Sequence, residues 1–100
     1  MEIVKTQDGG KIVLTLTGRL DAVTAPQLQG ALLPAFDDGM LVELDFANLR
    51  YVSSAGLRVL ILGEKTAKSK KAIMSLVNVP QEVKAIFDIT GITEILKIRG

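Results

Sequence analysis

Two adjacent hydroxyl side chains, Ser53 and Ser54, hold the position in this sequence that best suits chemistry. They follow a strand-like run at 40–46 and precede a helix-like run that reaches about Lys70. The start of a helix presents unpaired backbone N–H groups and the positive end of the helix dipole. A phosphate group placed there would be stabilised without disturbing the fold. The spacing therefore predicts a site for a reversible charge switch.

The residue types needed for catalysis at these hydroxyls are missing. A hydrolase serine at a strand-to-helix turn needs a histidine base, and the sequence contains no histidine. The glycine that stands two residues before such a serine is also absent. Asp37, Asp38 and Asp45 are not spaced as metal ligands, and there is no Gly-x-x-x-x-Gly-Lys segment. We therefore expect no enzymatic activity, no metal site and no cofactor.

Structural roles offer alternative explanations for the polar residues of this region. Ser53 or Ser54 is suited to capping the helix, a contact whose loss costs about 1 kcal/mol. Asp21 is suited to bonding local backbone in the loop before Thr24. Gly56 lowers helix propensity in the first turn. It indicates either close packing or access for another surface beside Ser54.

Composition places the chain among globular proteins. Its 100 residues are expected to form a single domain, 1–100. Apolar residues make up 48% and charged residues 23%, and the net charge of +1 provides no basic surface for nucleic acid. There is no cysteine, no signal-peptide pattern and no apolar run longer than 59–62. The sequence therefore predicts a cytoplasmic protein without membrane insertion, and the lack of a trailing linker suits a stand-alone protein.

Hydrophobic periodicity predicts five strands. They are expected at 2–6, 11–17, 40–46, 72–77 and, as a short final segment, 95–98. Asp8 and Gly9 mark a hairpin between the first two strands because these residues accept positive φ. In the third strand, the even-numbered residues from Met40 to Phe46 are expected to share one apolar face.

Three helices are predicted between these strands. They are expected from Thr24 to a stop at Asp37-Asp38-Gly39, from Ala55 to about Lys70, and from Asn78 to Thr90-Gly91. Thr24 and Asn78 are predicted N-caps, and Gly39 is predicted to take a left-handed cap conformation. Residues 92–96 are expected to form a turn of helix or a loop.

The order of these elements predicts an α/β fold. The strand–helix–strand connection makes the third and fourth strands parallel, through a right-handed crossover. The N-terminal hairpin and the parallel strands would form a mixed β-sheet, with helices packed mainly on one face. An open face or edge would remain for a partner.

Three segments resemble the signature of STAS domains, and in particular that of bacterial anti-sigma factor antagonists. The first is 45–57, which contains both serines. The second, Gly18-Arg19-Leu20-Asp21, is similar to the family's Gly-x-Leu-Asp after the second strand. The third, 79–92, is similar to the last conserved helix and the turn after it. The three matches lie in the family's order and span nearly the whole chain, so the resemblance implies an STAS-like fold.

The resemblance also implies a partner switch in transcription regulation. Family members bind an anti-sigma factor that is also a serine kinase, and thereby release a sigma factor. The kinase phosphorylates a serine at the start of the helix after the third strand, which ends the binding. A serine phosphatase reverses this step.

Alignment on Gly56 carries the family's acceptor serine onto Ser54. The preceding residue is often aspartate in the family and is Ser53 here, which makes Ser53 a competing acceptor. Ala55 replaces a hydroxyl residue that is frequent at its position, and Asp21 falls on a family aspartate near the same end of the sheet. The resemblance implies a partner-binding set of Asp21, Ser53, Ser54, Gly56, Leu57 and Arg58.

A second hypothesis is a structural STAS module that docks to a transporter or a lipid-transport assembly. In that role Ser54 would serve only as a helix cap, and the exposed helix surface would hold a permanent partner. A pull-down that yields transporter subunits and no sigma-regulatory kinase would favour this hypothesis.

Overall fold

A five-stranded mixed sheet forms the centre of the protein in the structure, a computed structural model that describes residues 1–99. In chain order the elements are β1 (Glu2–Asp8), β2 (Lys11–Leu20), α1 (Ala25–Asp38), β3 (Leu41–Val52), α2 (Ser54–Ser69), β4 (Ile73–Val77), α3 (Gln81–Thr90), the 3-10 helix η1 (Ile92–Glu94) and β5 (Lys97–Arg99). The strand order is β1-β2-β3-β4-β5, antiparallel between β1 and β2 and parallel elsewhere. This confirms the predicted α/β fold with its N-terminal hairpin.

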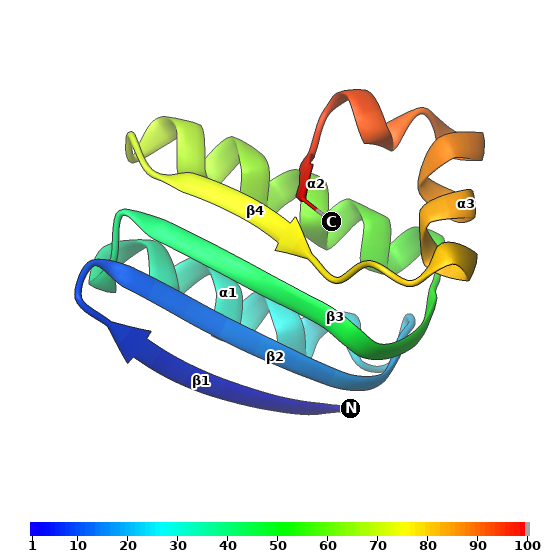
Figure 1. Cartoon of the computed structure of the whole chain (residues 1–100), viewed down its shortest axis with the longest axis horizontal. Helices are drawn as coiled ribbons and strands as arrows, with labels where there is room; N and C mark the ends of the chain where they lie inside the picture. The colour runs from blue at the N-terminus through cyan, green and yellow to red at the C-terminus, as the bar shows by residue number, and fades with distance from the viewer. Residues whose placement is uncertain (100) are drawn as a thin grey trace.

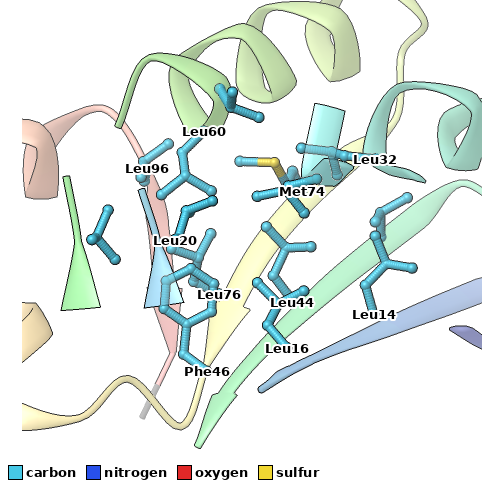
Figure 2. Close-up of a cluster of buried hydrophobic side chains, with 14 of the residues drawn as sticks. Leu14, Leu16, Leu20, Leu32, Leu44, Phe46, Leu60, Met74, Leu76 and Leu96 are labelled. Carbon is cyan, nitrogen blue, oxygen red and sulfur yellow. The ribbon is translucent and has the colours of Figure 1, made fainter. Parts of the chain in front are cut away.

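The helices are distributed unevenly about the sheet. Figure 1 shows α1 and α2 behind the sheet and α3 at the end where β3 leads into α2, while the near face carries no helix among the described residues. Strands place alternate side chains on opposite faces, so the buried apolar residues Leu14, Leu16, Leu44, Met74 and Leu76 of β2, β3 and β4 form an apolar layer against the helices. In Figure 2, Leu44 and Met74 extend from the strands toward Leu32 of α1. The rings of Phe46 and Phe87, with centroids 6.2 Å apart, join α3 to β3.

The strands differ from the predicted ranges mainly at their ends. β3 begins at Leu41 and continues to Val52, well beyond the expected end at 46, and β2 continues to Leu20. Two irregularities in the β2–β3 register let these long strands stay paired as far as Leu20 and Val52. Met40 lies outside the strand and is 63% exposed, so its predicted place on the apolar face is wrong.

Both predicted N-cap side chains have other partners. The hydroxyl of Thr24 donates to the backbone oxygen of Arg19 at 2.8 Å and makes no cap hydrogen bond to α1. Asn78 lies before the first turn of α3, and its amide donates to Oδ1 of Asp45 at 3.2 Å. Hydrogen bonds to residues of β2 and β3 therefore replace the helix caps that the sequence predicts.

The helix ends use glycine in two different ways. Gly91 takes the left-handed conformation, with φ of 77°, as expected at the end of α3. Gly39 is extended, so its predicted left-handed cap is wrong. A Cβ at Gly39 would stand only 2.7 Å from the backbone oxygen of Gly10. Glycine is needed there for space rather than for handedness.

Candidate functional site

The two serines occupy different positions at the junction of β3 and α2. Ser53 is the N-cap of α2, and its hydroxyl oxygen accepts a hydrogen bond from the backbone N–H of Gly56 at 3.3 Å. The expected capping role therefore belongs to Ser53. Ser54 is the first residue of the helix, its side chain is exposed, and its hydroxyl makes no hydrogen bond to the described residues. The two hydroxyls thus differ in solvent exposure and in hydrogen bonding: that of Ser53 accepts a backbone N–H, and that of Ser54 is exposed and unbonded within residues 1–99.

The first turn of α2 is free of negative charge. It contains no acidic residue, so the partial positive charge of the helix N-terminus is not offset within the helix. Arg58 follows Ser54 by four residues on the same side of the helix. Its side chain is exposed and forms no ion pair with any residue in 1–99. An anion on Ser54 would therefore lie at the positive end of α2, with Arg58 one helical turn further along.

Close packing holds this turn of α2 against the end of β2. The backbone N–H of Ser53 donates to the carbonyl oxygen of Leu20 at 2.8 Å. A Cβ on Gly56 would stand 2.6 Å from Cγ of Leu20, so packing, rather than access for another surface, accounts for this glycine. Leu57 is buried as well. Gly56 and the side chain of Leu57 therefore face the protein interior, and the expected contact of these two residues with a partner does not fit this conformation.

Asp21 organises the loop between β2 and α1. Its Oδ1 atom accepts hydrogen bonds from the backbone N–H of Val23 at 3.0 Å and of Thr24 at 3.1 Å. The N–H of Thr24 is the main reason that the pKa of Asp21 lies below its usual value, and Val23 and Arg19 act in the same direction. The local backbone role expected for Asp21 is therefore confirmed, with its carboxylate in the ionised form.

Three further residues at this corner, Arg19, Tyr51 and Val23, are not found by reasoning from the sequence. The guanidinium of Arg19 lies 4.5 Å from the centroid of the Tyr51 ring and 3.9 Å from Oδ2 of Asp21. Val23 is 85% exposed. The contact between Arg19 and Tyr51 follows from the parallel pairing of β2 with β3, which sets these two residues opposite each other.

No cluster of three or more metal-binding side chains occurs within residues 1–99. Within the same range, no helix combines the length and apolarity that crossing a bilayer requires.

Comparison with known proteins places the chain in a family. The family model described as "Mlab, STAS domain" matches residues 3–97. The anti-sigma-B factor antagonist of Listeria monocytogenes is 27% identical over 98 residues, covering 97% of this chain and 86% of that protein.

Solved structures show the same fold at lower identity. The anti-sigma factor antagonist SpoIIAA in its unphosphorylated form superposes with a TM-score of 0.82 at 17% identity, covering 99% of this chain and 89% of that one. The Bacillus protein SpoIIAA in its phosphorylated form superposes with a TM-score of 0.75 at 15% identity, covering 99% and 92%. From the family match and these likenesses, the chain belongs to the STAS domain family, together with the anti-sigma factor antagonists that it resembles.

Proposed function

We propose that this protein is an anti-sigma factor antagonist that binds a serine-kinase anti-sigma factor, releases a sigma factor, and is switched off by phosphorylation of Ser54. The observation that carries the proposal is the exposed, unbonded hydroxyl of Ser54 at the first position of α2. The naming of relatives as antagonists supports the general role of a regulatory binding protein in the bacterial cytoplasm. One of the structural relatives is known in a phosphorylated form.

The two serines differ as phosphate acceptors. In the transfer, the Ser54 hydroxyl oxygen attacks the γ-phosphorus of ATP, the bond to the β–γ bridging oxygen breaks, ADP leaves, and the hydroxyl proton passes to a base on the kinase. This attack needs an oxygen that the kinase can reach. The oxygen of Ser53 is half-buried and accepts the N–H of Gly56, so we assign it the capping role and Ser54 the acceptor role.

The charge change accounts for a switch that leaves the fold intact. A phosphoserine adds about −1.5 to −2 charges at neutral pH. On the free protein, the N-terminus of α2 stabilises this charge by roughly 0.3–1 kcal/mol. In a complex the dianion is desolvated against the partner, and an uncompensated buried charge costs several kcal/mol, on the order of 3–5. Because each ~1.4 kcal/mol is a tenfold change in affinity, a hundredfold loss of binding follows easily.

The partner-contact set that we propose is smaller than the one expected from the family. Ser53, Ser54 and Arg58 lie at the start of α2 and would meet the partner directly. Asp21 would act indirectly, by ordering the neighbouring loop, which the Ser53–Leu20 hydrogen bond holds beside that helix. Gly56 packs on Leu20 inside the protein and is not part of the proposed partner contact. A serine phosphatase would restore the binding form by hydrolysing the phosphate on Ser54.

The test uses the purified protein and each kinase-type anti-sigma factor encoded in the same genome. We expect Ser54→Ala to bind the kinase in the presence of ATP without being switched off, and Ser54→Asp to bind about a hundredfold more weakly. Ser54→Asn is the matched control, since it has similar size and no charge. Mass spectrometry after incubation with kinase and ATP should locate the phosphate on Ser54.

Phosphate on neither Ser53 nor Ser54 would contradict the proposed regulation. Capture of transporter subunits without a sigma-regulatory kinase would favour the structural module instead.

A further inference from the structure

Val23 carries a solvent-exposed apolar side chain on an ordered loop. It is 85% exposed, in the turn between β2 and α1. Its backbone N–H donates to the Asp21 carboxylate, and the Ala25 N–H donates to the Asp21 backbone oxygen at 2.8 Å. The Thr24 hydroxyl accepts a hydrogen bond from the Asp21 N–H at 2.9 Å and donates one to the backbone oxygen of Arg19 at 2.8 Å. These hydrogen bonds fix the loop, so Val23 is presented in a set position without packing on its own protein.

The loop that carries Val23 belongs to the same corner as Ser54. Leu20, three residues before Val23, accepts the backbone N–H of Ser53 and packs on Gly56. Arg19 bridges from the Asp21 carboxylate to the ring of Tyr51, two residues before Ser53. A partner that covers Ser54 therefore meets this loop on the same side of the protein.

We propose that Val23 is an apolar anchor of the interface with the anti-sigma factor, entering an apolar pocket of that partner beside Ser54. The proposal rests on the proposed function and adds a specificity-determining residue to it. An exposed valine gains free energy when a partner buries it, and a loop already ordered loses little conformational entropy on binding. Asp21 acts as a positioning residue, since its carboxylate holds the backbone of Val23 rather than meeting the partner first.

The test measures the equilibrium affinity and off-rate of the purified kinase-type anti-sigma factor for matched variants. Val23→Thr keeps the branched shape but puts a hydroxyl in the pocket, and Val23→Ala removes two methyl groups. We expect each to weaken binding about tenfold, mainly through a faster off-rate. Met40→Thr is the control, because Met40 is 63% exposed and precedes β3 at the strand's opposite end from Ser54. Its affinity should stay within about twofold.

The positioning role of Asp21 is tested by a double-mutant cycle. Asp21→Ala should weaken binding in the wild-type background and add little in the Val23→Ala background, because both changes disturb one contact. Asp21→Asn, which keeps an oxygen acceptor for the two N–H groups, should restore most of the affinity. An independent, additive loss from Asp21→Ala would contradict the positioning role.

The outcomes separate this proposal from the proposed function. If Ser54→Asp abolishes binding while Val23→Ala and Val23→Thr bind like wild type, the anchor is wrong and the phosphorylation switch stands. An equal loss in Met40→Thr would also overturn the anchor, because the effect would not be local. If wild-type protein binds none of these kinases, both proposals fail.

Discussion

Gly56 at the start of α2 packs directly on Leu20 at the end of β2. A Cβ on Gly56 would stand 2.6 Å from Cγ of Leu20 and 3.1 Å from its carbonyl oxygen. The backbone N–H of Ser53 donates to the same carbonyl at 2.8 Å. This contact joins the two chain segments of the candidate site, the Asp21 loop and the Ser54 turn, into one rigid corner.

Gly56→Ala should therefore destabilise the protein despite the higher helix propensity of alanine. Overpacking against Leu20 is expected to lower the free energy of unfolding by about 1–3 kcal/mol. Urea unfolding followed by circular dichroism measures this change. Gly30→Ala in α1 is the matched control, since no atom lies within 4 Å of the added Cβ. It should stabilise the protein by about 0.5–1 kcal/mol. A stabilised Gly56→Ala protein would contradict the packing role.

The elements of this fold are predictable from the sequence because their periodicity is local. Alternation in β2 and helical spacing in α2 are properties of neighbouring residues, and both elements form where predicted. The position of Ser54 at the start of a helix follows from the same local pattern. The family resemblance then adds a role for that hydroxyl which spacing alone does not provide.

What the sequence does not predict depends on contacts that reach beyond the element concerned. The Thr24 hydroxyl bonds Arg19 at the end of the preceding strand, and the Asn78 amide bonds Asp45 of β3. These partners compete with the N–H groups of the helix that each side chain would cap. The extent of β3 to Val52 depends on pairing with β2 through register shifts. The exposure of Val23 depends on how the loop leaves the end of β2, so the sequence alone does not predict it.

Ser53→Ala should weaken the start of α2 without removing the acceptor hydroxyl. The lost hydrogen bond to the N–H of Gly56 is 3.3 Å long, so the expected cost is about 0.5–1 kcal/mol, at the low end for an N-cap. Urea unfolding measures it. Ser69→Ala, at the exposed last position of α2, is the control and should change stability by less than about 0.5 kcal/mol. Equal effects at both ends of the helix would argue against the cap.

Asp21 should contribute to stability above its unfolded-state pKa and lose that contribution in acid. Because the N–H groups of Thr24 and Val23 favour the ionised carboxylate, the pKa of Asp21 is lowered in the folded protein. A lowered pKa means stabilisation that is complete above the unfolded value of about 3.9 and declines as pH falls through the folded value.

Asp21→Asn keeps an acceptor oxygen and removes the titration. Its free energy of unfolding should therefore fall less than that of the wild type between about pH 7 and pH 2. Urea titrations at several pH values measure both curves. Parallel acid losses in the two proteins would show that Asp21 is not the group responsible.

The buried carboxylate of Glu64 makes Lys97 a stabilising residue of the C-terminal strand. Glu64 of α2 is 2% exposed, and its Oε2 atom lies 3.0 Å from Nζ of Lys97 and 3.9 Å from Nζ of Lys68. Its Oε1 atom is buried without a hydrogen-bond partner among the described residues. Lys97→Met removes the nearer cation, so a buried charge keeps only a distant partner. The expected loss is about 1–3 kcal/mol in urea unfolding.

A double-mutant cycle separates this pair from a general effect of removing a lysine. Lys84→Met on α3 removes an exposed lysine with no ion pair in residues 1–99, and it should change stability by less than about 0.5 kcal/mol. In a Glu64→Gln background, Lys97→Met should cost much less than in the wild type, because no buried charge is then left uncompensated. If the cost is the same in both backgrounds, Lys97 stabilises β5 through packing of its side-chain stem, and the ion pair contributes nothing to holding that strand on the sheet.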